Sequence, residues 1–267
     1  MTTKNVCWIT GASSGIGAAL AIEMAGRGNV LLLSARNEDA LRTVQKQCYA
    51  TGASEDDIHL LPLDVTDELA IKNAVADVMR DIGRIDLLIN NAGISQRSIC
   101  LDTDMATYRR LFEVDVFGQI ALTKAILPHM IAQESGHIAV TASVAGKIGV
   151  PLRTGYCAAK HAMMGFFDAL RAEVAQHNIQ VSTIVPGFIH TNLAKNALKG
   201  DGSAFAQTDS DIANGMAADK AATIIAQGLA KQKKEIPVGE GLEMVGLYLK
   251  RFFPSIIFRM MAKRARQ

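Results

Sequence analysis

Three residues near the middle of the chain have the side chains needed for acid–base chemistry: Ser143, Tyr156 and Lys160. Tyr156 and Lys160 are four residues apart, so a helix beginning near Gly155 would place the phenol and the ammonium on one face. Free tyrosine, with a pKa of about 10, is a poor proton carrier at neutral pH, and a nearby cation favours its phenolate. Ser143, at the end of the preceding predicted strand, would hold the reacting oxygen. A Tyr-x-x-x-Lys pair alone is also typical of a half-buried aromatic beside a solvated lysine, so the rest of the chain must decide.

The elements that would position these residues alternate between strand and helix. The strands are apolar throughout, which is typical of a parallel sheet covered on both faces. We therefore predict an α/β fold, a single-domain Rossmann-type doubly wound parallel sheet spanning residues 1–267. The predicted strands are 5–10, 30–34, 58–63, 85–90, 137–142 and 179–185. The predicted helices are 15–27, 39–50, 67–82, 105–133, where Pro128 could bend or break the helix, and 155–177.

The composition indicates a folded cytoplasmic protein. Of 267 residues, 49% are hydrophobic and 20% charged, enough to bury a substantial core. The formal charge of +2 gives no electrostatic argument for nucleic acid. The chain shows no signal peptide and no apolar run of about 18 residues, so we expect no membrane-spanning helix. Its cysteines lack paired spacing and its histidines lack metal-ligand spacing, so we expect reduced thiols and no metal site.

A glycine-rich turn follows the first predicted strand and opens the first helix, with the sequence Thr10-Gly11-Ala12-Ser13-Ser14-Gly15-Ile16-Gly17. Glycines permit a tight turn and close approach of the backbone to a pyrophosphate, and the helix N-terminus offers N–H groups. The spacing differs from the commoner Gly-x-Gly-x-x-Gly fingerprint, and such a turn can also be purely structural. Its position at the first strand–helix junction favours a dinucleotide.

The end of the second predicted strand indicates which dinucleotide binds. A carboxylate there binds the ribose 2′-hydroxyl of NAD, whereas an arginine accepts the 2′-phosphate of NADP. This chain has Arg36 and no carboxylate before Glu38. The guanidinium favours NADP(H), the alternative being a solvated loop arginine.

Over residues 4–192 the sequence resembles the short-chain dehydrogenase/reductase family. The family's Thr-Gly-x-x-x-Gly-x-Gly motif matches Thr10–Gly17, and its Asn-Asn-Ala-Gly motif matches Asn90–Gly93. Its catalytic serine, tyrosine and lysine match Ser143, Tyr156 and Lys160 at the same spacing. The resemblance implies a cofactor site formed by Gly11, Ser13, Ser14, Gly15, Ile16, Gly17, Arg36, Asp64, Val65, Asn91, Ala92, Gly93, Tyr156, Lys160, Pro186, Gly187, Ile189 and Thr191.

The resemblance also implies the activity. The expected reaction transfers a hydride between the nicotinamide and a small-molecule secondary alcohol or ketone, with Tyr156 moving the proton. Lys160 would favour the phenolate and bind the ribose hydroxyls. A homodimer or homotetramer is expected. One alternative is a catalytically weakened NADP-binding regulator or scaffold, and another is isomerase or dehydratase chemistry on the same scaffold.

One position departs from the family pattern. The family's fourth catalytic residue is an asparagine in an Asn-x-x-Gly context, and here the chain has Asp115-Val-Phe-Gly118. In the family this residue's backbone carbonyl holds a water in the proton relay to the lysine, which an aspartate can also offer. Its carboxylate cannot donate as an amide does, and near Lys160 it would favour the ammonium. We expect an altered but surviving activity.

Two further segments are expected to shape the substrate region. Residues 188–215 resemble the family's mobile substrate lid, and their apolar positions indicate either a hydrophobic, lipid-like substrate or ordinary lid packing. Those positions are Leu193, Ala197, Leu198 and Phe205, together with Ile148, Val150, Pro151 and Leu152. The tail, 246–267, is apolar and carries six basic residues and no acidic one. It could contact a membrane peripherally, cover the substrate entrance or pack on a partner subunit.

Overall fold

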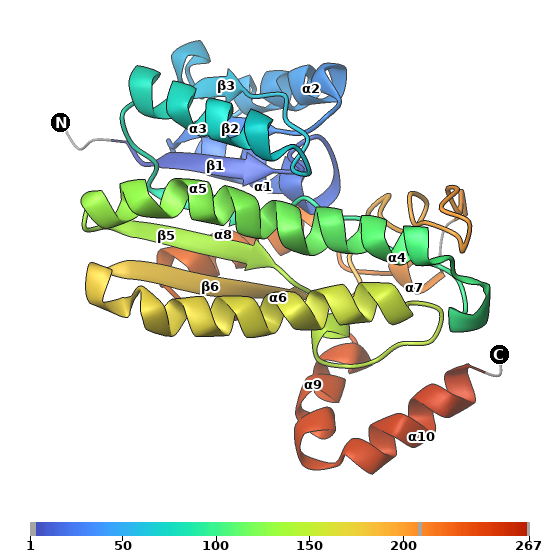
Figure 1. Ribbon diagram of the computed structural model, residues 1–267. Coiled ribbons are helices and arrows are strands. Elements are labelled where there is room, and N and C mark those ends of the chain that lie inside the picture. Colours follow the sequence, from blue (N-terminus) through green and yellow to red (C-terminus); the bar gives the residue numbers. More distant parts are fainter. Residues whose placement is uncertain (1–3, 208–209, 266–267) are drawn as a thin grey trace.

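The computed structural model describes residues 4–207 and 210–265 and contains a seven-stranded parallel sheet (Figure 1). The strand order is β3-β2-β1-β4-β5-β6-β7, so the chain reverses direction across the sheet between β1 and β4. Such a reversal opens a crevice at the carboxyl ends of the two central strands. The strands are β1 (Val6–Thr10), β2 (Val30–Ser34), β3 (Ile58–Leu60), β4 (Leu87–Asn90), β5 (Gly136–Thr141), β6 (Ile179–Pro186) and β7 (Glu235–Val238).

Helices cover both faces of the sheet. One face is covered by α1 (Gly15–Gly26), α2 (Glu38–Tyr49) and α8 (Ala218–Ala230). The other is covered by α3 (Glu68–Asp81), α5 (Gly118–Ala132) and α6 (Thr154–Glu173), of which α5 and α6 lie in front of the sheet in Figure 1. The remaining helices are α4 (Met105–Phe112), α7 (Ser210–Ala213), α9 (Leu242–Phe252) and α10 (Pro254–Arg264). The predicted doubly wound α/β fold is confirmed.

Strand β1 shows why the central strands are apolar throughout. Cys7 and Ile9 pack into the core on one face of the sheet, and Val6 and Trp8 pack into the core on the other. Because successive side chains point to opposite faces, a strand between two helix layers must be apolar at every position. The only indole in the chain, on Trp8, donates from Nε1 to Ser34 Oγ at 2.8 Å inside this core.

Strand β7 was not predicted, and the largest boundary differences from the prediction are in three places. The strand expected over 58–63 ends at Leu60, and the helix expected over 155–177 ends at Glu173. The helix expected over 105–133 is divided by a π-helical turn, Glu113–Phe117, and continues through Pro128 to Ala132. Hydrophobic spacing does not distinguish a π turn from an α turn, because one extra residue shifts the apolar face by less than a third of a turn.

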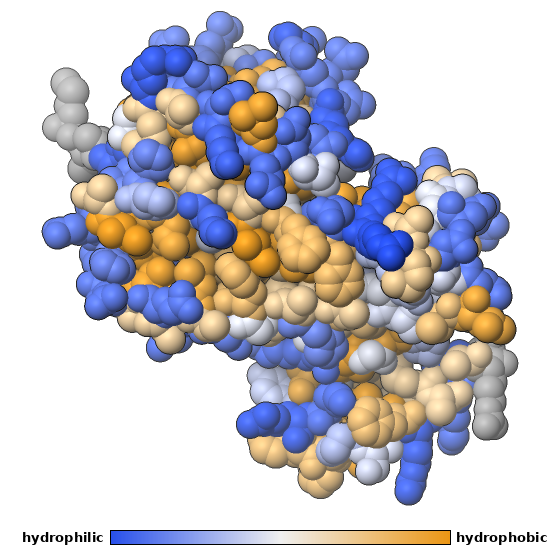
Figure 2. All heavy atoms as spheres, viewed as in Figure 1, coloured by the Kyte–Doolittle hydropathy of each residue, from blue (hydrophilic) through white to orange (hydrophobic). Residues whose placement is uncertain are grey.

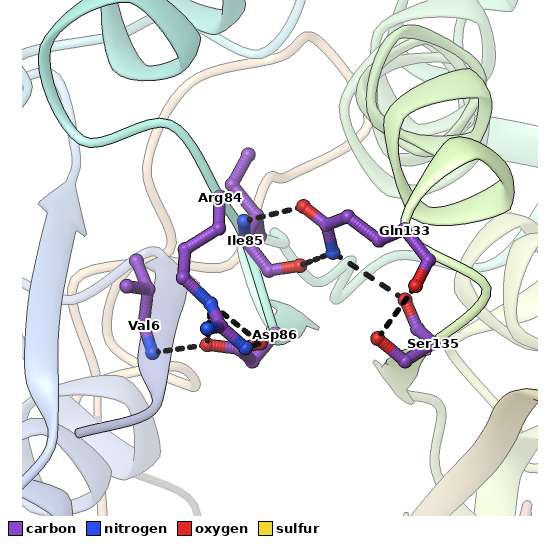
Figure 3. A network of polar contacts seen from close by, with 6 residues as sticks. All are labelled: Val6, Arg84, Ile85, Asp86, Gln133 and Ser135. Atoms are coloured by element: carbon purple, nitrogen blue, oxygen red, sulfur yellow. Dashed lines mark hydrogen bonds and ion pairs between the residues drawn. The ribbon is translucent and has the colours of Figure 1, made fainter. Parts of the chain in front are cut away.

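Polar contacts hold the amino ends of β1 and β4 together, at the ends of the strands opposite the crevice (Figure 3). Asp86 accepts a hydrogen bond from Val6 N at 2.8 Å and pairs with Arg84. The Gln133 amide, at the end of α5, donates to Ile85 O at 3.1 Å and accepts from Ile85 N at 3.3 Å. These contacts tie α5 to β4 far from the carboxyl ends of the strands.

The tail forms a helical hairpin that projects beyond the α6 side of the sheet (Figure 1). Its inner face packs on a small core of Val144, Ile148 and Val185, to which α10 adds Ile257. Arg266, one of the six basic tail residues, lies outside the described residues, as do positions 208–209 of the predicted lid. Within the described ranges, no helix has both the length and the hydropathy needed to cross a membrane.

Candidate active site

A cavity of about 1140 Å³ lies at the carboxyl ends of the strands. Its walls come from the segments that follow β1, β2, β4, β5 and β6, together with α6 and the α9–α10 hairpin. Of the predicted site residues, all but two line this one cavity. The exceptions are Gly17 and Asp115, each of which is buried next to a residue of the wall.

The glycine turn has the backbone geometry of a phosphate cradle. Gly11 and Gly15 have φ angles of +65° and +56°, in the left-handed region that favours glycine. A Cβ on Gly11 would lie 2.9 Å from Ala92 Cα, so the turn packs directly against the segment after β4. Ser14, in the N-cap position of α1, makes no capping hydrogen bond within the described chain, and the first helical turn carries no acidic residue. The N-terminus of α1 therefore fits an anionic pyrophosphate.

Gly17 has a different role from the one predicted. We expected it to contact the cofactor, but it lies beneath the turn, where a Cβ would collide with the carbonyl oxygen of Gly11 and approach Asn91 Nδ2 to 2.5 Å. A side chain at this position would push the turn off the helix. Gly17 thus permits the close packing of α1 under the cradle, and the cradle itself is formed by residues 11–16.

The Asn90–Gly93 segment connects the cradle to the catalytic strand. Thr10 Oγ1 accepts hydrogen bonds from Asn91 N at 2.9 Å and Ala92 N at 3.0 Å. Asn91 Nδ2 donates to Thr10 O at 3.0 Å, and Asn91 Oδ1 accepts from Thr141 Oγ1 at 3.2 Å. Asn91 therefore joins the ends of β1, β4 and β5 at the point where the cavity opens.

The end of the cavity formed by the segments after β2 and β3 is basic. Arg36, Asn37 and Arg110 line it together with Asp64, whose carboxylate accepts from Thr66 N at 3.0 Å and Thr66 Oγ1 at 2.8 Å. Burial acts to raise the pKa of Asp64, but the Thr66 hydrogen bonds and the charges of Arg36 and Arg110 outweigh it and hold the pKa below its usual value. Asn37 and Arg110 were missed by the sequence analysis; Arg110 lies on α4, seventy-four residues after Arg36.

The predicted catalytic residues meet where β5 ends and α6 begins. Ser143 follows β5, and its Oγ accepts from Ala145 N at 3.1 Å, with Pro186 O at 3.5 Å as its acceptor. Tyr156 lies in the first turn of α6, and Lys160 one turn later with its Nζ 5.6 Å from the centroid of the Tyr156 ring. All three line the cavity, so the predicted grouping is present in the structure.

Asp115 lies in the π-helical turn with its side chain fully buried. Its Oδ1 accepts from Ile94 N at 2.7 Å, and its Oδ2 is 3.2 Å from Lys160 Nζ. Burial raises the pKa of Asp115 against the opposing effect of the Lys160 charge. Burial would lower the pKa of Lys160, but Asp115 and Tyr156 outweigh it and raise that pKa. Lys160 Nζ also donates to Thr141 O at 3.1 Å. Asp115 is thus a positioning residue that acts on the cavity through Lys160.

Gln96 orients the start of the catalytic helix and was missed by the sequence analysis. Its side chain is fully buried, and its Oε1 accepts from Gly155 N at 2.7 Å and Tyr156 N at 3.4 Å. Its Nε2 donates to Thr103 Oγ1 at 3.0 Å and Ser98 Oγ at 3.1 Å. Gln96 therefore satisfies N–H groups in the first turn of α6 that no intrahelical carbonyl can reach. It is separated by sixty residues from the tyrosine, so no local motif marks it.

The predicted apolar substrate residues divide into two groups. Ile148, Val150, Leu193 and Leu198 line the cavity. The other four, Pro151, Leu152, Ala197 and Phe205, do not line it: Ala197 is buried, and the ring of Phe205 lies 5.8 Å from Arg97 Cζ. The α9–α10 hairpin adds the apolar wall residues Leu242, Ile257, Met260 and Met261, which agrees with one of the three expectations for the tail, that it covers the substrate entrance.

Comparison with known proteins identifies the family. The sequence model of the short chain dehydrogenase family matches residues 5–202. The chain belongs to the short-chain dehydrogenase/reductase family. It is 40% identical over 262 residues to "Dehydrogenase/reductase SDR family member 7B" of Bos taurus, covering 97% of this chain and 81% of the bovine protein.

Solved structures of short-chain dehydrogenases/reductases include complexes with either dinucleotide. The enzyme from Burkholderia phymatum in complex with NAD superposes with a TM-score of 0.82 at 24% identity, covering 95% of each chain. A metagenomic short-chain oxidoreductase in complex with NADP gives a TM-score of 0.71 at 28% identity, covering 88% of this chain and 96% of that one. As a member of this family, the chain is an oxidoreductase that binds NAD(P) and acts on small molecules.

Proposed function

We propose that this short-chain dehydrogenase/reductase uses NADP(H) to interconvert a hydrophobic ketone and its secondary alcohol. The observation that carries the proposal is the single cavity that joins Ser143, Tyr156 and Lys160 to a basic end formed by Arg36 and Arg110. Acid–base groups and a dinucleotide in one cavity would allow proton transfer to the oxygen and hydride transfer to the carbon of the same carbonyl group.

When bound, the nicotinamide supplies or accepts the hydride. The chain's own residues bind and orient the reacting oxygen and move the proton. The Ser143 hydroxyl donates a hydrogen bond to the oxygen, and the Tyr156 hydroxyl gives it a proton in reduction and takes one back in oxidation. The Lys160 ammonium, 5.6 Å from the Tyr156 ring centroid, stabilises the phenolate left after proton transfer.

Two features of the basic end support NADP over NAD. Arg36 follows β2 by two residues and lines the cavity, where a guanidinium can pair with a 2′-phosphate. Arg110 places a second guanidinium on the same wall, from α4. The positions after β2 that line the cavity, Ala35, Arg36 and Asn37, carry no negative charge to repel the phosphate.

The substrate end of the cavity supports a hydrophobic substrate. Its wall combines Ile148 and Val150 from the loop before α6 with Leu193 and Leu198 from the 188–215 segment. Met260 and Met261 of α10 close the same wall. Polar side chains from the same segments, Asn192, Asn196 and Glu243, also line the cavity and could orient the substrate, while burial against the apolar wall would supply much of the binding free energy.

A panel of ketones and alcohols of graded hydrophobicity, followed by NADPH absorbance, tests the proposed reaction. We expect turnover with NADPH that exceeds turnover with NADH, and higher kcat/KM for the more apolar ketones. Tyr156→Phe should lose about 10²-fold to 10⁴-fold in kcat while binding NADPH as the parent does. NADPH binding without turnover across the panel would instead favour the regulator or scaffold, and near-parental turnover in Tyr156→Phe would contradict the assignment.

We also propose a cytoplasmic homodimer or homotetramer that pairs through α4 and α5. In Figure 2 hydrophobic residues run along α5, across the middle of the view. Phe117, at the junction of α4 and α5, is 54% exposed, and Ile120, Ala121 and Leu127 are only partly buried. Light scattering of Phe117→Glu tests the proposal: we expect a smaller assembly than the parent, and an unchanged mass would contradict this interface.

A further inference from the structure

The α9–α10 hairpin exposes far more apolar surface than its length would lead one to expect. Residues 242–264 hold eight of the fourteen large hydrophobic side chains that are exposed among the described residues. These eight are Leu242, Val245, Tyr248, Phe252, Phe253, Ile256, Phe258 and Met260. Figure 2 shows hydrophobic and hydrophilic residues side by side over the projecting hairpin, in the lower part of the view. Such a concentration of exposed apolar side chains on one element indicates an interaction surface.

Helix α9 is apolar on two opposite sides. Its inner side packs on the body through Gly246, which is buried, and Leu247, which contacts the core around Ile148. Its outer side carries Leu242, Val245, Tyr248 and Phe252 at spacings of three, three and four residues, which is one helical stripe. These four side chains are exposed, so the outer stripe is available to another apolar surface.

After Glu243, in the first turn of α9, every charged side chain of the hairpin is basic. Arg251, Arg259 and Lys263 are exposed on the hairpin, and Lys250 Nζ lies 4.3 Å from the centroid of the Phe258 ring. The sequence contains no acidic residue after Glu243. Large apolar side chains mixed with arginine and lysine fit a surface that is apolar inside and anionic outside, as a bilayer with acidic headgroups is.

A second copy of the chain fits this surface less well. In a two-fold symmetric contact the same patch meets itself, so Arg251, Arg259 and Lys263 would face the same cations across the interface. Like charges brought together in this way repel, and the hairpin offers no carboxylate after Glu243 to pair with them. Charge complementarity therefore favours an anionic lipid surface over self-association.

The hairpin also forms part of the cavity. Leu242, Met260 and Met261 line the same cavity as Tyr156, so the docking element and the active site share a wall. A lipid surface in contact with the hairpin would lie at the mouth of this cavity. An apolar molecule dissolved in the lipid could then reach the cavity without crossing water.

We propose that the α9–α10 hairpin docks on the surface of an anionic lipid bilayer, with the outer stripe of α9 in the headgroup region. The docking proposal stands apart from the redox reaction, because it rests on the exposed residues of the hairpin alone. The hairpin, whose two helices have 11 residues each, would lie at the bilayer surface and not cross it.

Vesicle flotation of the full chain tests the docking. We expect recovery with vesicles of phosphatidylcholine and phosphatidylserine, weaker recovery with phosphatidylcholine alone, and loss of much of the difference at high salt. The variant Arg259→Glu with Lys263→Glu should lower the recovered fraction at least tenfold. Lys72→Glu with Lys231→Glu makes the same change in net charge at exposed positions elsewhere and should float as the parent does.

A separate variant tests the outer stripe and combines Val245→Ser, Tyr248→Ser and Phe252→Ser. Its control combines Leu69→Ser and Leu101→Ser, which alter exposed leucines outside the hairpin. Only the first should lose flotation, and NADPH binding measured by fluorescence should persist in both. The proposal is overturned if the charge variant floats as well as its control. It is also overturned if the hairpin variants dissociate an oligomer in light scattering while flotation is unchanged, which would assign the surface to a second copy.

Discussion

The Asp115 carboxylate and the Lys160 ammonium form a buried ion pair, with Oδ2 3.2 Å from Nζ. Asp115 also accepts from Ile94 N, so the carboxylate is fixed by the segment that follows β4. Gly93 completes the packing, because a Cβ there would lie 3.3 Å from Lys160 Nζ and 3.4 Å from Asp115 Oδ1. The negative charge offsets part of the positive field that Lys160 exerts on Tyr156.

We expect Asp115→Asn to remain active with its pH profile moved to lower pH. The amide oxygen can still accept from Ile94 N, but the charge next to Lys160 is lost. Without it, the ammonium favours the Tyr156 phenolate more strongly, and the pKa of Lys160 falls because Asp115 is the main group that raises it. Both limbs of kcat/KM against pH for alcohol oxidation should therefore shift to lower pH.

Asp168→Asn is the control for this shift. Asp168 is an exposed carboxylate on α6 that pairs with Arg171, so its loss should leave the pH profile unchanged. A profile of Asp115→Asn that coincides with the parent would mean that Asp115 does not act on the proton transfer.

Gln96→Leu should slow catalysis by more than its loss of stability would explain. Removing the side-chain oxygen leaves Gly155 N–H buried without its acceptor, at a cost of about 1–3 kcal/mol in the free energy of unfolding. The first turn of α6, which carries Tyr156, loses its fixed position, so we expect kcat to fall at least tenfold with a smaller change in KM.

Gln133→Leu provides a matched comparison for Gln96→Leu. The Gln133 amide also forms hydrogen bonds with backbone groups, those of Ile85, but at the amino ends of the strands, away from the cavity (Figure 3). It should lower the melting temperature and leave kcat within twofold of the parent. An equal loss of kcat in both variants would reduce the role of Gln96 to general stability.

Arg36→Gln should reduce the preference for NADPH over NADH by at least tenfold. The expected cause is a weaker affinity for the 2′-phosphate, which raises KM for NADPH and leaves KM for NADH nearly unchanged. Arg42→Gln, which removes an exposed guanidinium on α2, is the control. If KM for both dinucleotides changed equally in Arg36→Gln, the 2′-phosphate assignment would be wrong.

His137 predicts how stability depends on pH. Burial lowers the pKa of His137 from 6.5 to about 4. Ser182 Oγ donates to Lys233 O at 2.6 Å, so at the 2.7 Å contact with His137 the histidine Nε2 is the donor. Between these two pKa values the unfolded chain binds a proton that the folded chain does not.

Stability should therefore fall as pH decreases from 6.5 toward 4, by on the order of 2 kcal/mol for this group. His137→Gln, which keeps a donor for Ser182, should flatten that part of the curve. Urea unfolding at a series of pH values measures the effect, and an identical slope in the parent and the variant would exclude His137 as its source.

The sequence determined the parts of this protein that depend on local order. The alternation of apolar strands and amphipathic helices predicted the doubly wound sheet, because each strand in it must be apolar on both faces. The spacing from Ser143 through Tyr156 to Lys160 predicted their grouping, because the last two share a helix face and the first ends the adjoining strand. The glycine motif did not distinguish the roles of its glycines: Gly11 forms the cradle, whereas Gly17 packs beneath it.

The tertiary structure decided which distant residues meet. Gln96 reaches Gly155 because the segment after β4 lies next to the start of α6, and Arg110 joins Arg36 because α4 and the segment after β2 line the same cavity. The folding of the tail into a hairpin with one covered side and one exposed side likewise depends on the core around Ile148. The spacing of apolar residues along the sequence shows which face of a helix or strand is apolar. Which element packs on that face depends on the arrangement of the whole sheet.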